Sequence, residues 1–372
     1  MKKVLILLKQ LNLNNNEPFF CFSPHILRKN VIQFKDKFPG RLIYSVKANP
    51  SKHVLKLMKN CGVNSFDAAS IKEIETVYNV LDNVRIYFMN TVKSRCSIRE
   101  AYFKYNIKDF SLDTLEELNK ILEETLYAED LNLHLRLSIP NNFSKINLSS
   151  KFGATVNEAK IILDKMRKIS CKVGISFHAG SQCMNPKAYK TAIKISNEVI
   201  KENSAIIDYF NVGGGFPAKY PGSKILPLTE YFSVINKEFK NLGLPKKVKL
   251  MAEPGRCLVS DSMSLNVKVT LRKFNFLYIN DGVHGSLYDA GVNKFKHSVN
   301  IINRKVSNKK LFPFSFYGPT CDSSDFMEGP FLLPNCIREG DWIQIHEMGA
   351  YAITMQSDFN GFFSKKKIFI NK

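Results

Sequence analysis

Short apolar runs alternate with helix-like segments through the first two thirds of the chain. Each run has the length and composition of a strand buried in a sheet. The predicted strands are Ile43–Lys47, Ser65–Ala68, Val84–Phe88, Asp109–Leu112, Leu133–Leu137, Val173–His178, Asp208–Val212 and Val248–Glu253. The predicted helices between them are Ser51–Asn60, Ile71–Tyr78, Thr114–Glu124, Val156–Lys168, Lys187–Lys201 and Glu230–Asn241. Several of these begin at a residue type that commonly caps a helix, such as Ser51 or Thr114.

Eight strand signals that alternate with helices predict an α/β fold with a parallel sheet, and eight is the strand count of a (β/α)8 barrel. A doubly wound open sheet fits the same alternation. The residues at the strand ends favour the barrel, because barrel enzymes place their chemistry at the C-terminal ends of their strands. These residues are Lys47, Asp67, Arg136, His178, Gly213–Gly215 and Glu253.

After about Cys257 the pattern changes to short strand-like pieces separated by turns that carry glycine and proline. This pattern is typical of a β-sandwich or β-barrel, which the early run Phe19–Phe22 is expected to complete. The pieces are Ser264–Leu271, Phe276–Asn280, Leu311–Tyr317, Trp342–Glu347 and Ala352–Phe359. We therefore predict a barrel domain over residues 25–257 and a β domain built from residues 1–24 and 258–372.

Composition narrows the class of protein. The chain has 372 residues, of which 44% are hydrophobic, which is enough for one large domain or two ordinary ones. The formal net charge of +21 is compatible with a nucleic-acid partner. The lysines are scattered, however, and no DNA- or RNA-binding motif occurs, so we attribute the charge to compositional drift and expect no such partner. We expect the run Lys365–Lys367 to be a solvated turn.

The N-terminal sequence resembles the start of a signal peptide, with a basic Met1–Lys3 and an apolar Val4–Leu8. The apolar run is short, Lys9 ends it, and no small-residue cleavage site follows. No stretch approaches the ~20 apolar residues of a membrane span. The eight cysteines have no C-x-x-C spacing, so we predict free thiols and no metal site in a cytoplasmic protein.

Lys47 ends the first predicted barrel strand and precedes a break at Asn49-Pro50. A lysine that is held by a rigid strand and taken out of water loses its charge more easily. Its amine can then attack an aldehyde to form a Schiff base. The structural alternative is a lysine at a strand end that extends its ammonium into solvent.

Two glycine-bearing motifs follow later strands. In Gly213–Pro217, three consecutive glycines would let backbone N–H groups approach a phosphate. In the second motif, Glu253–Arg256, Gly255 could add a backbone donor and Arg256 a cation to the same phosphate. Glu253 could then face a ring nitrogen that must stay protonated. The alternative is a β-turn with a surface arginine.

Two further segments carry titratable side chains. Phe177–Ser181 places His178 at a strand end, and Ser181 could donate to a phosphate, although a lone histidine among apolar neighbours is usually a satisfied core residue. In the loop that contains Cys321 and Asp322, a thiol next to a carboxylate could serve as a proton donor.

Together these segments resemble the fold-type III pyridoxal-phosphate decarboxylases, and among them most of all the bacterial ornithine decarboxylases. The resemblance runs from about Phe19 to Phe362. Its motifs are Tyr44–Pro50, Phe177–Ser181, Gly213–Pro217, Glu253–Arg256, Asn280–Gly282, Tyr317–Asp325, Met348–Tyr351 and Phe359–Phe362. The resemblance implies a barrel of the alanine-racemase type, a C-terminal β-sandwich or β-barrel domain, and pyridoxal 5′-phosphate as cofactor. It also implies a head-to-tail homodimer that decarboxylates L-ornithine to putrescine and CO2, in polyamine biosynthesis.

The resemblance implies a role for each residue of the cofactor site. Lys47 would form the Schiff base, and His178 would stack on the ring. Glu253 would pair with the pyridine nitrogen and keep the ring an electron sink. Asp67 and Arg136 would line the site. The phosphate would be held by Ser181, Gly213, Gly214, Gly215, Gly255, Arg256 and Tyr351.

The substrate residues would come from the other motifs. Cys321 would cross the dimer interface and protonate the α-carbon after CO2 leaves. Asp322 would pair with the distal ammonium, and Phe359 would pack near it. Tyr288 and Asp289 are further substrate-binding candidates, although their segment matches the family pattern only loosely.

Three further features bear on substrate choice and assembly. His284 stands where relatives commonly have tyrosine. Lys151 could pair with the partner subunit's Asp325. Diaminopimelate decarboxylases usually place glutamate after the cysteine, so Asp322 favours ornithine or lysine.

Three alternatives to ornithine decarboxylation stay open, of which a diaminopimelate decarboxylase and a regulatory homologue are the less favoured. A lysine or dual lysine/ornithine decarboxylase fits as well, since one methylene changes binding by only ~1–3 kcal/mol. A regulatory homologue without activity would typically have lost the Schiff-base lysine or the phosphate loop, and this chain retains both.

Overall fold

The computed structural model describes residues 17–140, 142–146, 151–169, 172–202, 207–304, 310–362 and 368–370. The predictions for residues 1–9, Cys171 and residues 365–367 lie outside these ranges. The chain divides into two units. The barrel unit contains Arg28–Pro217 and Lys224–Leu258, and the β unit contains the chain up to Leu27, Ala218–Ser223 and the chain from Val259 onward.

The barrel unit is built on a ring of parallel strands, in the order β2-β12-β11-β9-β7-β6-β5-β4-β3. The strands are β2 (Arg41–Leu42), β3 (Tyr44–Ser45), β4 (Ser65–Ala68), β5 (Arg85–Phe88), β6 (Asp109–Leu112), β7 (Asn132–Arg136), β9 (Lys172–Ser176), β11 (Tyr209–Asn211) and β12 (Lys249–Ala252). Only Ile43 separates β2, which pairs with β12, from β3, which pairs with β4. The nine segments therefore act as eight strands, and the predicted barrel is confirmed over the open sheet.

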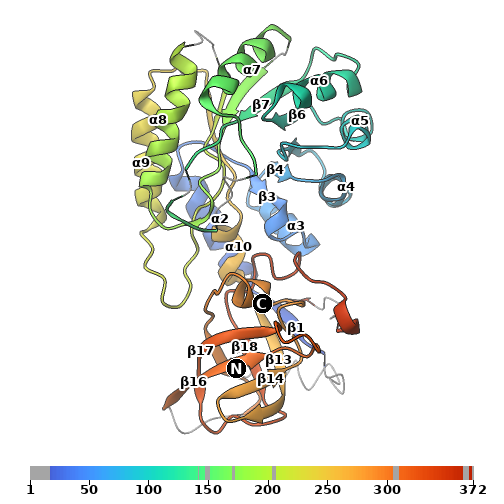
Figure 1. The fold of residues 1–372 in the computed structure, drawn as a ribbon, viewed down its shortest axis with the longest axis vertical. Helices are drawn as coiled ribbons and strands as arrows, with labels where there is room; N and C mark the ends of the chain where they lie inside the picture. Colours follow the sequence, from blue (N-terminus) through green and yellow to red (C-terminus); the bar gives the residue numbers. More distant parts are fainter. Residues whose placement is uncertain are drawn as a thin grey trace. The chain divides into compact units, whose positions relative to one another are not determined.

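Helices cover the outside of the strands (Figure 1). They are α2 (Pro24–Lys37), α3 (Lys52–Asn60), α4 (Ile71–Val80), α5 (Arg95–Phe103), α6 (Leu115–Glu124), α7 (Val156–Ile169), α8 (Lys187–Glu202) and α9 (Leu228–Asn241). The short α10 (Arg256–Val259) follows β12. The predicted cap at Thr114 is confirmed, because its hydroxyl accepts a hydrogen bond from the Glu117 amide at 3.1 Å. Ser51 lies at the cap position of α3, but its side chain makes no capping hydrogen bond.

The first barrel strand ends earlier than predicted. β3 stops at Ser45, and Lys47 lies in a 3-10 turn, η1 (Val46–Ala48), that closes with a hydrogen bond from the Asn49 amide to the Val46 carbonyl. The turn leads directly into the Asn49-Pro50 break, where proline disfavours helix at the preceding residue. Lys47 is therefore presented by a turn at the C-terminal end of the strand.

A network of polar side chains lies near the N-terminal ends of the barrel strands. Asp109 is 2% exposed and accepts hydrogen bonds from Arg85 Nε and Nη2, each at 2.7 Å. His134 Nε2 lies 3.0 Å from the same carboxylate, and the His134 ring stacks on Tyr209 with centroids 5.4 Å apart. Burial by itself would raise the pKa of Asp109, but hydrogen bonds and charge from His134 and Arg85 hold it below its ordinary value. The anion is thus compensated inside the barrel.

We expect Asp109→Ala to lower the free energy of unfolding by about 3–5 kcal/mol, because it leaves Arg85 and the buried His134 without their anion. Urea unfolding of the two proteins measures this difference. Asp130→Ala provides the control, since it removes an exposed partner of Lys108 and should cost less than about 1 kcal/mol. Equal losses in the two variants would contradict the network's role.

The β unit contains an eight-stranded mixed sheet with the path β15-β18-β13-β14-β16-β17, and β1 pairs with both β13 and β19. Its strands are β1 (Phe19–Phe22), β13 (Met263–Lys273), β14 (Phe276–Ile279), β15 (Val299–Ile301), β16 (Leu311–Tyr317), β17 (Phe326–Pro334), β18 (Trp342–Ile345) and β19 (Ile368–Ile370). The prediction that Phe19–Phe22 joins the C-terminal strands is confirmed, because β1 runs antiparallel to the start of β13.

Some elements differ from the prediction. The expected strand Ala352–Phe359 is wrong, since this segment forms turns that lead into η3 (Phe359–Gly361). β17 was not predicted because it contains Gly329 and Pro330, which usually interrupt strands. The remaining elements not predicted are α2, α5, β15, β19, α11 (Tyr288–Gly291), η2 (Ser260–Ser262) and the small β8–β10 pair (Ser144–Ile146 and Ser181–Cys183).

Three absences concern only the described part of the chain. None of its helices is both long and apolar enough to cross a membrane. No group of three or more His, Cys, Asp and Glu side chains there is arranged to hold a metal ion. The seven cysteines within the described ranges form no disulfide, as predicted. The cytoplasmic location stays a prediction.

Candidate active site

Lys47 lies beside two carboxylates at the C-terminal ends of the barrel strands. Its Nζ is 3.8 Å from Asp67 Oδ2, and its side chain is 42% exposed. Ser45 Oγ lies 2.9 Å from Asp67 Oδ2 and 3.2 Å from the carbonyl oxygen of Glu253. The expectation of a buried amine is therefore wrong. The amine stays accessible, and the turn that carries it is tied to both acidic residues.

Glu253 follows β12 and is buried, with 8% of its surface exposed. Asn211 Nδ2 donates to Glu253 Oε1 at 2.6 Å, and Asn211 Oδ1 accepts from the Gly213 amide at 2.9 Å. Burial and the charge of Asp67 raise the pKa of Glu253 to about 7, against the opposing effects of Lys47, Asn211 and Arg136. This carboxyl group is fixed in direction, and a nearby cation would strongly stabilise its ionised form.

In the protein without cofactor, folded Glu253 binds its proton more tightly than unfolded Glu253 does. Its contribution to stability should therefore fall as the pH rises from about 4.5 to about 7. We expect urea unfolding to show that the wild type loses stability relative to Glu253→Gln over this range. Glu75→Gln, at an exposed residue paired with Lys72, should show no such relative loss. A pH-independent difference between wild type and Glu253→Gln would contradict the raised pKa.

The glycine turn Gly213–Gly215 is packed so closely that it leaves no room for side chains. A Cβ on Gly214 would lie 2.8 Å from the Glu253 carbonyl oxygen and 2.9 Å from His178 Nε2. The Gly214 carbonyl accepts a hydrogen bond from the Tyr189 hydroxyl at 2.9 Å. A glycine turn held by its carbonyls in this way can offer backbone N–H groups to an anion.

His178 lies next to this turn, just beyond β9. Its Nδ1 accepts a hydrogen bond from the Gly180 amide at 3.0 Å, so the neutral ring carries its proton on Nε2. Burial, followed by the charges of Arg136 and Lys47, lowers the pKa of His178 well below its ordinary value. The imidazole is therefore neutral at physiological pH and provides a flat, uncharged face.

Two arginines predicted for the cofactor site are placed by the barrel. The Arg136 guanidinium at the end of β7 lies over the Phe152 ring, 5.1 Å from its centroid. Arg136 Nε is buried, with no hydrogen-bond partner among the described residues, and such a donor usually points to an acceptor that is not part of the chain. Arg256 is 5% exposed and follows Gly255. A Cβ on Gly255 would lie 2.9 Å from Ala48 Cβ, so glycine lets this segment approach the Lys47 turn.

The barrel unit thus brings together most of the predicted cofactor residues. Ser181 lies in β10, opposite Ile146 of β8. Residues that sequence reasoning missed are Ser45, Asn211 and Tyr189, which hold Asp67, Glu253 and Gly214. No motif singles them out, although Asn211 could have been noted as a polar residue at a strand end two positions before the glycines.

In the β unit, the loop between β16 and β17 presents Cys321 and Asp322. Asn360 Oδ1 lies 3.2 Å from the Cys321 amide nitrogen and 3.3 Å from Cys321 Sγ. Asp322 contacts His284 Nε2 at 2.8 Å. The His284 ring packs against Phe359, with centroids 4.9 Å apart. Three segments that are distant in sequence therefore meet around one exposed thiol and one carboxylate.

Ser324 completes the surroundings of Asp322. Its hydroxyl donates to Asp322 Oδ2 at 2.7 Å, and its amide donates to Asp322 Oδ1 at 2.9 Å. These two hydrogen bonds, together with the one from His284, lower the pKa of Asp322 to about 2. Asp322 is therefore anionic at any working pH.

Asp325 is a buried carboxylate that is hydrogen-bonded within the β unit. It is 1% exposed, and its carboxylate accepts hydrogen bonds from the Val283 amide at 2.7 Å and the Thr320 hydroxyl at 2.7 Å. These bonds join the Cys321 loop to the segment that carries His284. The ion pair between Lys151 and the partner subunit's Asp325 stays a prediction, and within its own unit this carboxylate is buried and hydrogen-bonded.

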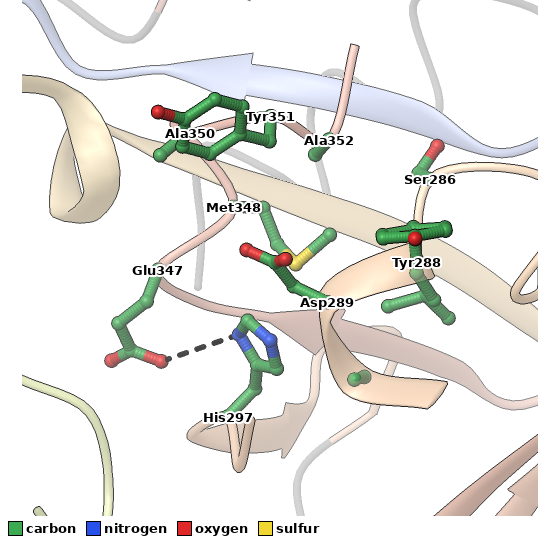
Figure 2. Close-up of a pocket in the computed structure, with 11 residues that line it drawn as sticks. Ser286, Tyr288, Asp289, His297, Glu347, Met348, Ala350, Tyr351 and Ala352 are labelled. Carbon is green, nitrogen blue, oxygen red and sulfur yellow. Dashed lines mark ion pairs between the residues drawn. The ribbon is translucent and has the colours of Figure 1, made fainter. Parts of the chain in front are cut away.

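Tyr288, Asp289 and Tyr351 line a small enclosed pocket of the β unit (Figure 2). Its volume of about 10 Å³ is enough for roughly one water molecule. Asp289 Oδ1 accepts a hydrogen bond from Asn293 at 2.7 Å. Figure 2 also shows an ion pair at the pocket wall, in which His297 Nδ1 lies 4.0 Å from Glu347 Oε2. Three of the predicted residues are therefore neighbours.

The fold and the strand-end side chains define a barrel enzyme, and comparison with known proteins identifies the family. The family model described as pyridoxal-dependent decarboxylase, pyridoxal binding domain, matches residues 25–260. The chain therefore belongs to the pyridoxal-dependent decarboxylases, of the fold-type III group that acts on ornithine, lysine or arginine, and pyridoxal phosphate is its cofactor.

Two curated relatives are similar over most of the chain. The probable ornithine decarboxylase of Dictyostelium discoideum is 31% identical over 379 residues, which cover 95% of this chain and 79% of the relative. The antizyme inhibitor 2 of Xenopus laevis is 33% identical over 361 residues, which cover 91% of this chain and 77% of the relative.

Two solved structures share the whole fold. The Paramecium bursaria Chlorella virus arginine decarboxylase bound to agmatine superposes with a TM-score of 0.87 at 27% identity, covering 100% of both chains. The lysine/ornithine decarboxylase of Vibrio vulnificus complexed with putrescine has a TM-score of 0.84 at 27% identity, covering 100% of this chain and 99% of that one.

The side chains of the barrel unit fit pyridoxal phosphate. An accessible amine, Lys47, can bond to the aldehyde, and the buried Glu253 can pair with a protonated ring nitrogen. The close-packed glycine turn carries no side chains that would stand between its backbone and a ligand, and Arg136 Nε has a hydrogen bond left to donate. The donor set therefore matches the aldehyde, ring nitrogen and phosphate of this cofactor.

Proposed function

We propose that the protein removes the carboxyl group of L-ornithine and releases putrescine and CO2, a step that supplies polyamines. The observation that carries the proposal is an aspartate, Asp322, which is held by Ser324 and His284 on the same loop as the exposed thiol of Cys321. An aspartate at this place suits a distal ammonium, and the adjacent thiol supplies a proton. The similarity to a probable ornithine decarboxylase supports the same substrate.

The residues of the barrel unit would hold the cofactor and keep it reactive. When bound, pyridoxal phosphate supplies a protonated ring that takes up the electron pair left behind by departing CO2. Glu253 would face the ring nitrogen and hold its proton, with Asn211 fixing the direction of the carboxylate. Lys47 would bind the aldehyde. The neutral His178 would lie against the ring without placing a second positive charge beside it.

The residues of the β unit would handle the substrate. Asp322 would bind the distal ammonium, and Phe359 would contact the methylene chain. Cys321 would deliver one proton to the α-carbon, which replaces the bond lost to CO2. We further propose that the Cys321 loop of one subunit completes the site of its partner in a homodimer. Tyr288, Asp289 and Tyr351 would border this site.

The main test is the release of CO2 from L-ornithine, L-lysine and L-arginine by the purified protein. We expect the highest kcat/KM for ornithine, together with an absorbance band near the visible edge from cofactor bound to Lys47. Lys47→Ala should lose both the band and the activity, because it removes the amine that would bind the aldehyde. If lysine were turned over faster, the preferred substrate would be lysine and not ornithine. The class of reaction, decarboxylation, would be unchanged.

A second test concerns Asp322. Asp322→Asn should lower kcat/KM for ornithine about 10–100-fold, mainly through KM, because the distal ammonium loses its charged partner. The absorbance of the bound cofactor should stay the same. Asp358→Asn alters a nearby exposed aspartate and should leave KM unchanged. If Asp322→Asn instead lowered kcat without affecting KM, Asp322 would not be the ammonium site.

A regulatory role without catalysis is the second candidate, because one relative is an antizyme inhibitor. The chain retains Lys47, the glycine turn, Glu253 and Cys321, which a protein without catalysis does not need. Absence of both the cofactor band and CO2 release in the purified protein would favour this candidate.

A further inference from the structure

His284 shares in holding the carboxylate of Asp322. Three donors converge on this group, with the Ser324 amide on Oδ1 and both the Ser324 hydroxyl and His284 Nε2 on Oδ2. A carboxylate offers about four acceptor positions, two on each oxygen. Both acceptor positions on Oδ2 are therefore occupied, and Oδ1 has one acceptor position still open.

The imidazole of His284 is held in this orientation. The His284 carbonyl accepts hydrogen bonds from the Ser357 amide at 2.9 Å and the Ser357 hydroxyl at 3.0 Å. Phe359 packs against the ring, and Val283 is tied to the buried Asp325. Because these contacts all lie within the β unit, the same unit fixes both the donor and the carboxylate.

The number of open acceptor positions distinguishes between two kinds of cationic ligand. A guanidinium binds best through two parallel N–H groups, one to each oxygen of a carboxylate. An ammonium is a compact charge and needs only one acceptor in a given direction. With Oδ2 filled, Asp322 can take a single further donor, which suits the ammonium.

We propose that His284 and Ser324 make Asp322 a single-acceptor site, which selects a distal ammonium and rejects a distal guanidinium. This inference rests on the proposed function, in which Asp322 binds the far end of the substrate. Such a site would separate diamino acids, which end in an ammonium, from arginine, which ends in a guanidinium. The distinction matters because one structural neighbour is an arginine decarboxylase.

The test measures binding of putrescine and agmatine to the cofactor-loaded, full-length protein by calorimetric titration. These ligands carry an ammonium and a guanidinium at the distal end, and their binding requires no turnover. The wild type should bind putrescine at least about tenfold more tightly than agmatine, as expected when one of two charge-assisted hydrogen bonds is missing.

His284→Phe keeps a ring against Phe359 but removes the donor, which frees one position on Oδ2. We expect the agmatine-to-putrescine ratio of Kd values to fall about tenfold. His284→Gln retains an N–H donor of similar reach and should keep the wild-type ratio. His25→Phe, at an exposed histidine of α2, is the matched control and should also keep it.

Ser324→Ala removes the other donor to Oδ2 and provides an independent variant. It should shift the ratio in the same direction as His284→Phe, and it carries the test if His284→Phe fails to fold. An unchanged ratio in the variants that fold, or a wild type that binds agmatine as tightly as putrescine, would overturn the proposal. Diamine selectivity without CO2 release from ornithine would instead refute the proposed function alone.

Discussion

The candidate site depends on one carboxyl group, that of Glu253, which is buried inside the barrel. Glu253 is buried, and both burial and the neighbouring Asp67 work against its ionisation. A charge in this position is costly unless a cation lies beside it. A protonated cofactor ring would be such a cation, so the burial of Glu253 would strengthen binding of the ring. Asn211 donates to the Glu253 carboxyl group, Ser45 donates to the Glu253 carbonyl oxygen, and the Glu253 amide donates to the Gly213 carbonyl.

The β unit uses buried carboxylates for a different purpose. Asp325 joins the Cys321 loop to the segment that follows β14, and Asp281 accepts hydrogen bonds from the Gly282 and Ser286 amides at 2.7 Å each. Such bonds satisfy backbone groups that would otherwise be buried without partners. The loops that present Cys321 and Asp322 are therefore held by buried acids, and the more accessible Asp322 is left for a ligand.

His284 shows how a departure from a family pattern gains meaning only in three dimensions. From the sequence it is a histidine where relatives commonly have tyrosine, with no partner assigned. In the folded unit it lies 2.8 Å from Asp322, although 38 positions separate the two in the chain. His284 and the expected substrate aspartate, Asp322, therefore form one hydrogen-bonded pair.

The sequence by itself determined the barrel, because strand and helix lengths repeat locally, and it identified Lys47, Glu253 and the three glycines, because each follows a strand. It wrongly predicted a strand at Ala352–Phe359, because an apolar run of that length does not distinguish a strand from packed turns. Tertiary structure decided the exposure of Lys47, the burial of Asp325 and the partners Ser45, Asn211, Tyr189 and Ser324. Hydrogen bonds and burial are set by residues that meet only when distant segments pack together, and such contacts leave no local pattern to read.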